Sequence, residues 1–204
     1  MSKTQLLLAT SNQGKLREAR EILGDLPFDL LALSDCESIQ PVAETGATFI
    51  ENASLKAIGY ASQTHLLTLS DDSGLEIEAL NGAPGVRSAR YLGEGNSYSV
   101  RNQSLLAELQ SHEKRAARFV CSIAIAASDG DLLSISTGVC DGRIATEPHG
   151  TEGFGYDPIF IPTGFENTFG ELPAQIKNRI SHRGRALAEA REFLSRLTRG
   201  ESAG

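Results

Sequence analysis

The sequence predicts an α/β protein in which a long twisted mixed β-sheet carries flanking helices and forms two lobes around a central cleft. In the first third of the chain, short apolar runs are each followed by helical periodicity, which is typical of βα units. Later, two apolar runs separated by an Asp-Gly turn indicate antiparallel strands. The length of 204 residues allows one domain of two lobes. We expect this domain to cover residues 1–197, and residues 198–204 to form a disordered tail.

Five segments read as strands. The short apolar runs at 5–10 and 28–33 predict buried strands in the first half of the chain. A third strand is expected within 65–74, ending where the chain runs into acidic residues and glycine. The runs at 119–127 and 132–139 predict a β-hairpin closed by the Asp-Gly turn. The early strands favour parallel pairing and the hairpin adds antiparallel pairing, so the sheet is expected to be mixed.

Four segments read as helices, because apolar residues recur in them at steps of three and four. The first is expected over about 14–23, with Glu18 and its charged neighbours largely outside the apolar face. The others are expected over about 49–60, 100–109 and 183–197.

Composition limits the classes of function. No apolar run approaches the roughly 20 residues that span a bilayer, and the N-terminal segment is too short for a signal peptide, so we expect a cytoplasmic protein without a membrane partner. The three cysteines show no Cys-x-x-Cys spacing, which indicates ordinary thiols. The net charge of -7 disfavours a general nucleic-acid binder. It allows a small polyanion as ligand, because a few local cations are enough to hold one.

The segment TSNQGK lies between the first predicted strand and its helix. A strand-to-helix turn offers free backbone N–H groups at the positive end of the helix dipole, which favours anion binding. Ser11 and Asn12 add hydrogen-bond donors, and Lys15 adds a charge for phosphate. The segment is not a Walker A loop, because the first glycine is missing and Leu16 stands where Ser or Thr would hold magnesium. The alternative is an N-capped helix with an exposed lysine.

Two adjacent carboxylates, Asp71 and Asp72, lie in the segment SDDSG. Crowded carboxylates repel unless a cation or a proton offsets their charge, and Mg²⁺ often takes one or two of them together with substrate phosphates. The segment therefore predicts a metal and base site, to which Glu44 and Lys56 would add a carboxylate and a cation. The alternatives are a polar turn at SDDSG and a solvated helix face around Glu44 and Lys56.

The segment GFGYDPIFIP combines glycines, aromatic residues and a carboxylate. Gly153 and Gly155 would let the backbone approach a ligand closely, and Phe154 or Tyr156 would lie against a flat ring. Asp157 would hydrogen-bond a ring nitrogen, a sugar or a partner residue. The alternative is an aromatic core cluster with a turn.

The segment KNRISHRG gathers four basic residues, Lys177, Arg179, His182 and Arg183, at the start of the last predicted helix. The helix dipole disfavours cations there, so the placement favours an anion or an electron-rich carbonyl among them. The alternative is an exposed basic loop.

Together, the phosphate donors, the paired carboxylates, the aromatic residues and the cations predict a nucleoside triphosphate pocket. At this point the sequence resembles the inosine triphosphate pyrophosphatases, the Ham1/RdgB family of non-canonical purine NTP pyrophosphatases. Five segments carry the resemblance, in the family's order: TSNQGKLREAREIL, ETGATFIENASLKA, DDSGLEIEALNGAPGVRSARY, GFGYDPIF and SHRGRALAEA. The resemblance extends from about Leu6 to about Leu197. It implies an ITPase-like fold, a homodimer, and Mg²⁺-dependent hydrolysis of dITP, ITP and XTP to the monophosphate and pyrophosphate, a house-cleaning role in the nucleotide pool.

The resemblance also implies roles for individual residues. Asp72 would be the general base and a metal-associated carboxylate, with Glu44 and Asp71 as further groups at the metal. Substrate binding is assigned to the residues Thr10, Ser11, Asn12, Gln13, Gly14, Lys15, Lys56, Ser73, Phe154, Gly155, Tyr156, Asp157, Lys177, His182 and Arg183.

Two other functions stay open from the sequence. One is a Maf-type pyrophosphatase acting on pyrimidine or modified nucleoside triphosphates. The other is a non-catalytic nucleotide-binding protein, which would have less need for paired carboxylates beside phosphate.

Overall fold

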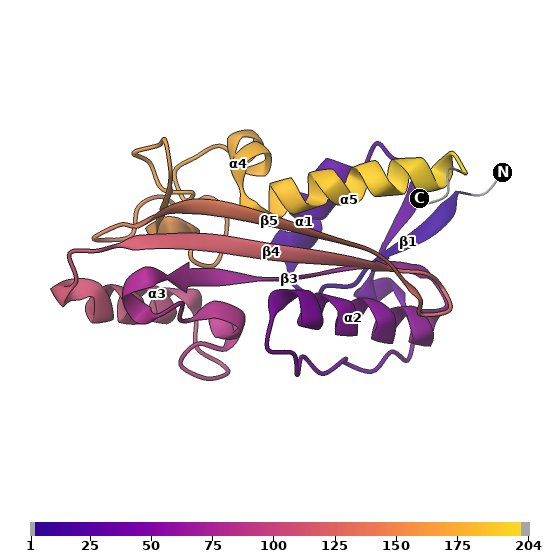
Figure 1. Ribbon diagram of the computed structural model, residues 1–204, viewed down its shortest axis with the longest axis horizontal. Helices are drawn as coiled ribbons and strands as arrows, with labels where there is room; N and C mark the ends of the chain where they lie inside the picture. The colour runs from indigo at the N-terminus through magenta and orange to yellow at the C-terminus, as the bar shows by residue number, and fades with distance from the viewer. Residues whose placement is uncertain (1–2, 201–204) are drawn as a thin grey trace. The chain divides into compact units, whose positions relative to one another are not determined.

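The computed structural model of the protein describes residues 3–200, and within them the chain forms a mixed six-stranded sheet with flanking helices (Figure 1). The strand order is β2-β1-β3-β4-β5-β6. The strands are β1 (Thr4–Leu8), β2 (Phe28–Ala32), β3 (Leu67–Ile77), β4 (Ala116–Ala126), β5 (Leu132–Ile144) and β6 (Phe160–Pro162). The helices are α1 (Gln13–Leu23), α2 (Phe49–Thr64), α3 (Tyr98–Glu108), α4 (Ala174–Ile180) and α5 (His182–Thr198).

Strand pairing confirms the mixed sheet. β1 runs parallel to both β2 and β3, with Leu6 opposite Leu30 on one side and Leu67 on the other. β5 and β6 are antiparallel, with Ile144 opposite Phe160. The predicted α/β class is therefore confirmed.

Five elements, β3, β4, β5, β6 and α4, differ from the sequence prediction. β3 does not end at its acidic residues but continues to Ile77, so Asp71 and Asp72 lie inside a strand rather than in a polar turn. The hairpin strands are longer than expected, and α4 and β6 were not predicted. Helix α4 has seven residues and β6 has three, which is too short for either to show a periodic pattern. Of the predicted tail, Thr198 is the last residue of α5, and residues 201–204 lie outside the described part of the chain.

The chain divides into two compact units. Unit 1 consists of residues 1–72, 121–138 and 183–204, and unit 2 of residues 73–120 and 139–182.

In unit 1, helices cover both faces of the sheet. α1 and α5 pack on one face, where Leu16, Leu23 and Leu187 meet apolar residues of β1, β3 and β4. α2 lies on the other face (Figure 1). It meets β4 through a cluster of small buried residues, Ala53, Ala57, Ala61, Ala124 and Ala126. Alanine at these positions lets the helix backbone approach the strand closely.

Unit 2 has an aromatic core. Phe119 of β4, Phe160 of β6 and Phe169 pack together, with ring centroids 4.6–6.3 Å apart. Leu105 of α3 and Leu75 of β3 belong to the same buried cluster. This core fixes the segment that contains GFGYDPIFIP.

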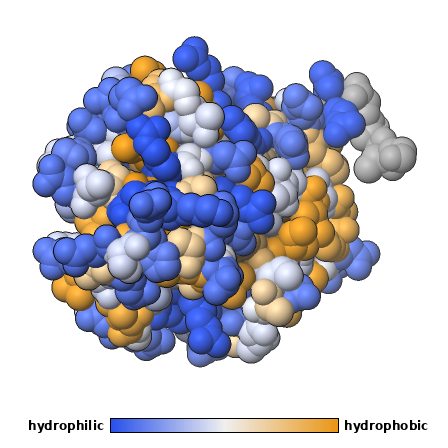
Figure 2. All heavy atoms as spheres, turned by 60° about the vertical axis from the view of Figure 1, so that its left-hand side comes forward, coloured by the Kyte–Doolittle hydropathy of each residue, from blue (hydrophilic) through white to orange (hydrophobic). Residues whose placement is uncertain are grey.

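The surface in Figure 2 is mostly hydrophilic, with hydrophobic residues gathered in smaller patches. Among the described helices, none combines the length and the apolar character needed to cross a bilayer.

The alanine contact yields a stability prediction. Replacing Ala57, which is fully buried, by leucine should lower the free energy of unfolding by about 1–3 kcal/mol, because added methyl groups overpack a filled space. Urea titration would measure the change. The control is Leu55→Ala on the exposed side of α2, expected to stay within about 0.5 kcal/mol of wild type. A neutral Ala57→Leu variant would show that the helix is not tightly packed.

Candidate functional site

The start of α1 is capped by Asn12. Its side-chain oxygen accepts hydrogen bonds from the backbone N–H groups of Gly14 (2.9 Å) and Lys15 (3.1 Å). Thr10 Oγ1 accepts one from Asn12 N at 3.2 Å. The segment TSNQGK therefore forms an N-capped helix start, as the alternative predicted. The lysine is not exposed, however: the Lys15 side chain is 17% exposed, and its ammonium lies 3.0 Å from Asp71 Oδ2. Of the remaining positions, Ser11 and Gln13 are exposed.

Because β3 continues through SDDSG, its two carboxylates point to opposite faces of the sheet. Asp71 faces α1 and α5. Asp72 faces α2. The two neighbouring carboxylates are therefore held by different side chains on the two faces of the sheet.

Asp71 lies in a buried chain of charges. Its Oδ2 lies 3.0 Å from Lys15 Nζ and 3.2 Å from Arg183 Nε, and Arg183 Nη1 lies 2.8 Å from Glu18 Oε2. Burial alone would raise the pKa of Asp71, but the charges of Lys15, Arg183 and Lys56 outweigh burial and lower it. Burial likewise opposes the charged form of Arg183, and Asp71 and Glu18 more than compensate, so the pKa of Arg183 is raised.

Glu18 is a partner that the sequence prediction missed. The prediction placed it outside the apolar face of α1, which is wrong, because Glu18 is buried against Arg183. Glu18 lies three residues, about one turn, after Lys15 on α1. This spacing was the available sign that it lies near the same site.

Asp72 belongs to a second cluster, formed with α2 and the segment before it. Asn52 Nδ2 donates to Asp72 Oδ2 at 3.0 Å. Lys56 Nζ lies 3.2 Å from Glu44 Oε1 and 3.9 Å from Asp72 Oδ1, and it donates to the backbone oxygen of Asp71 at 2.7 Å. Burial raises the pKa of Asp72; Lys56, Lys15 and the Asn52 hydrogen bond oppose the rise, and Glu44 adds to it. The structure thus brings together Glu44, Lys56 and Asp72, as the sequence predicted.

The oxygen donors of this second cluster fit a hard divalent cation. Among residues 3–200, no three His, Cys, Asp or Glu side chains form a ready-made metal site. Mg²⁺ does not need one, because it usually binds one or two carboxylates and completes its shell with water and substrate phosphates. Asp72 and Glu44 offer two such carboxylates around Lys56. Asp71 fits less well, because its Oδ2 already receives Lys15 and Arg183.

In unit 2, Asp157 organises the GFGYDPIFIP segment. Its Oδ2 accepts the backbone N–H of Phe154 at 2.6 Å and pairs with Lys177 Nζ, also at 2.6 Å. A Cβ atom at Gly153, where φ is +71°, would lie 2.1 Å from the same oxygen, so this position requires glycine. Of the possible partners predicted for Asp157, the structure supplies a protein residue, Lys177.

The two aromatic candidates differ. Tyr156 is part of the core: its hydroxyl donates to Ser88 O at 2.8 Å and its ring packs edge-on against Tyr98. Burial, then Tyr98, raise the pKa of Tyr156. Phe154 is half-buried, with Lys177 Nζ 4.7 Å from its ring centroid. The core-cluster alternative therefore holds for Tyr156, whereas Phe154 keeps an exposed part.

Three other predicted residues, His182, Ser73 and Gly155, are not part of the charge clusters or of the Asp157 contacts described above. His182 is buried and stacks on Phe119, with centroids 4.5 Å apart and planes 9° from parallel. Ser73 is half-buried in β3. Gly155 is half-buried, and its carbonyl accepts from Asn102 Nδ2 at 3.2 Å. KNRISHRG is not an exposed basic loop, because Lys177, His182 and Arg183 are buried.

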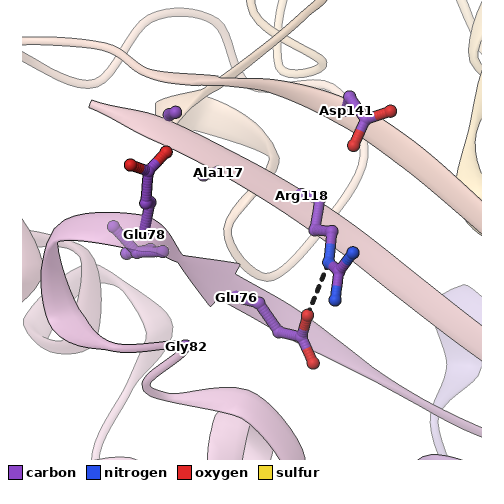
Figure 3. A pocket seen from close by; sticks show the side chains of 8 residues that line it. Glu76, Glu78, Gly82, Ala117, Arg118 and Asp141 are labelled. Atoms are coloured by element: carbon purple, nitrogen blue, oxygen red, sulfur yellow. Dashed lines mark hydrogen bonds and ion pairs between the residues drawn. The ribbon is translucent and has the colours of Figure 1, made fainter. Parts of the chain in front are cut away.

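A hollow of about 320 Å³ in unit 2 contains none of the predicted site residues. It is lined by Glu76 and Glu78, Arg118 of β4, and Asp141 of β5 (Figure 3). Arg118 pairs with Glu76 at 2.6 Å, and its side chain is more than half exposed. Such an exposed ion pair contributes little to stability. Because the hollow also contains none of the predicted site residues, it is distinct from the candidate site.

Comparison with known proteins decides the family. A model described as the Ham1 family matches residues 6–193. The chain belongs to the Ham1 family. A relative from Geobacter sulfurreducens named dITP/XTP pyrophosphatase is 49% identical over 94% of this chain and 96% of its own length. One from Desulfotalea psychrophila with the same name is 48% identical over 90% and 82%. The solved HAM1 protein from Coxiella burnetii superposes with a TM-score of 0.86 at 43% identity, covering 94% of this chain and 98% of that one.

These findings confirm the Ham1 resemblance and the fold that it implied. The roles of individual residues stay predictions, and the geometry now groups them. In unit 1 the Ham1-family chain holds Lys15, Asp71 and Arg183 in one cluster and Glu44, Lys56 and Asp72 in another. Asn52 is the second residue to which the sequence assigned no role, because the segment ENASLK shows it only as one polar residue of a helix.

The buried charge chain yields a pH-dependent prediction. Asp71→Asn should lower the free energy of unfolding at neutral pH by about 3–5 kcal/mol, because Arg183 and Lys15 lose a buried partner. The pKa of Asp71 is lowered in the folded protein, so its stabilising effect is present above the unfolded-state value of about 3.9 and is lost as the pH falls below it. The difference between wild type and variant should therefore shrink toward about pH 3.

Urea unfolding of both proteins across this pH range would measure the difference. The control is Asp29→Asn, an exposed carboxylate of β2, which should change the free energy of unfolding at neutral pH by no more than about 0.5 kcal/mol. A constant difference down to the lowest pH would contradict the assignment to Asp71.

Proposed function

We propose that this Ham1-family chain is a Mg²⁺-dependent nucleoside triphosphate diphosphohydrolase. It would hydrolyse dITP, ITP and XTP to the monophosphate and pyrophosphate, and so remove non-canonical purine nucleotides from the pool. The observation that carries the proposal is the cluster of Asp72, Glu44 and Lys56 in a chain 49% identical to a dITP/XTP pyrophosphatase. A homodimer and a cytoplasmic location are part of the proposal and rest on the family resemblance and on composition.

The charge balance of unit 1 supports a divalent cation. Four carboxylates, those of Glu18, Glu44, Asp71 and Asp72, face three cations, Lys15, Lys56 and Arg183. A triphosphate would add several negative charges, which these side chains alone do not balance. Mg²⁺ held by Asp72 and Glu44 would supply the missing charge and stabilise the leaving pyrophosphate. Asp71, also predicted at the metal, is better suited to holding Lys15 and Arg183.

The side chains of unit 1 would then act as follows. Lys15 and Lys56 bind phosphate oxygens with charges that are already fixed in place by Asp71 and Glu44. Asp72 orients and deprotonates a water molecule that attacks phosphorus, most simply the α-phosphorus.

Unit 2 would bind the purine. One face of the Phe154 ring is taken by Lys177, and the other would stack on the base. Hypoxanthine and xanthine carry an oxygen at position 6 where adenine carries an amine, so hydrogen-bond donors such as Lys177, His182 and backbone N–H groups would favour them over adenine. Guanine carries the same oxygen, so the rejection of GTP would act on its 2-amino group. A site built on hydrogen bonds can discriminate by roughly 10⁴-fold or more.

The first test is pyrophosphate release from ITP, XTP, dITP, GTP, ATP and a pyrimidine triphosphate, with and without Mg²⁺. Mg²⁺-dependent release from the first three and little from the others is expected. Asp72→Asn should lower kcat by about 10²–10⁴-fold, because it removes the base, while Asp29→Asn serves as the matched control. Near-normal turnover of Asp72→Asn at saturating Mg²⁺ would exclude the base role, and equal hydrolysis of ATP and ITP would exclude the base selectivity.

The second test concerns Phe154. Phe154→Ala should raise the KM for ITP about 5- to 150-fold, because base–aromatic stacking contributes about 1–3 kcal/mol. The control is Phe165→Ala, a second half-buried phenylalanine of unit 2, expected to leave KM nearly unchanged. An unchanged KM in the Phe154 variant would refute the stacking role.

A further inference from the structure

Asn52 is a fully buried polar residue whose two amide atoms are both hydrogen-bonded. Its Nδ2 donates to Asp72 Oδ2 at 3.0 Å, and its Oδ1 accepts from the backbone N–H of Gly46 at 2.8 Å. A buried amide is costly unless it is paired. Here the pairing joins β3, which carries Asp72, to the segment that carries Glu44.

The helix places Asn52 beside Lys56. The two residues are four apart on α2 and so share one face. Lys56 forms an ion pair with Glu44 and donates a hydrogen bond to the backbone oxygen of Asp71. Asn52 adds directional bonds, because an amide can donate to the carboxylate and accept from the backbone at the same time.

The segment before α2 lies tightly against the helix. A Cβ atom at Gly46 would lie 2.8 Å from Asn52 Oδ1 and 2.6 Å from Glu51 Cβ. Glu51 Oε2 accepts from the backbone N–H of Ala47 at 2.6 Å and of Thr48 at 3.2 Å. The segment that follows Glu44 is thus tied down at three consecutive N–H groups, those of residues 46–48.

We propose that Asn52 is a positioning residue of the hydrolysis: its amide fixes the Asp72 carboxylate and the Glu44 segment in one arrangement around Lys56. Without the amide, the Asp72 carboxylate loses the hydrogen bond that orients its Oδ2, and the Glu44 segment loses one of its three ties. The inference rests on the proposed function and adds a residue that touches neither substrate nor metal but acts through Asp72.

The test is a double-mutant cycle on the steady-state kinetics of ITP hydrolysis. Asn52→Ala should lower kcat on the order of 10- to 100-fold, because misplacing a reacting group by about 1 Å has effects of that size. The KM for ITP should change little, since Lys15 and Phe154 remain. In the Asp72→Asn background the same change should lower kcat much less, because only the tie to the Glu44 segment is still lost. An equal loss in both backgrounds, or a loss confined to KM, would overturn the proposal.

Two further variants separate positioning from folding. Ser70→Ala removes another buried bond between β3 and α2, from Ser70 Oγ to Ala53 O at 2.7 Å, without touching a carboxylate, and should leave kcat nearly unchanged. Asn52→Asp keeps the volume and the acceptor for Gly46 but loses the donor to Asp72, so its kcat should fall at least as far as that of Asn52→Ala. If Ser70→Ala reduced kcat as strongly, the effect would be structural and the proposal would fail.

The wild-type enzyme, measured in the same series, distinguishes a failure of the Asn52 inference from a failure of the proposed function. Active wild type with unaffected Asn52 variants would overturn this inference alone. Wild type without pyrophosphate release from any of the triphosphates would overturn the proposed function, and this inference with it.

Discussion

Three cations of unit 1 depend on one buried residue, Asp71. Its carboxylate holds Lys15 and Arg183, and its backbone oxygen accepts from Lys56. A buried charge is costly to desolvate, and it is tolerated here because every partner is itself charged and hydrogen-bonded. Since these cations come from α1, α5 and α2, a single position of β3 fixes the side chains that reach it from three helices.

Packing and chemistry are linked at α2. The alanines on its inner face let the helix approach β4, and the same approach brings Asn52 and Lys56 within reach of β3. Larger side chains would overpack this contact or move the helix outward. The small residues are therefore part of the site as well as of the core, because the polar contacts need the short distance that alanine allows.

The sequence predicted the strongly periodic elements and the residue types of the site, but not how the site is divided. Long amphipathic helices such as α5 have a clear pattern, whereas α4, with seven residues, has none. Asp71 and Asp72 looked like a pair because they are neighbours in the chain. Only the length of β3, which periodicity did not reveal, places them on opposite faces. Glu18 became recognisable once Arg183 was seen beside it, a contact 165 positions distant in the chain.

The alternation of β3 has a consequence for how this segment can vary. Asp71 and Asp72 are the same residue type, but their positions are not equivalent, because alternate residues of β3 face opposite sides of the sheet. A single-residue insertion or deletion before Asp71 would turn Leu69 and Ser70 to each other's faces, bringing a hydroxyl into the apolar layer under α1 and α5 and a leucine against α2. A substitution changes one side chain, whereas an insertion or deletion moves every upstream side chain of the strand to the opposite face of the sheet. Length variation is therefore expected to be confined to the loops.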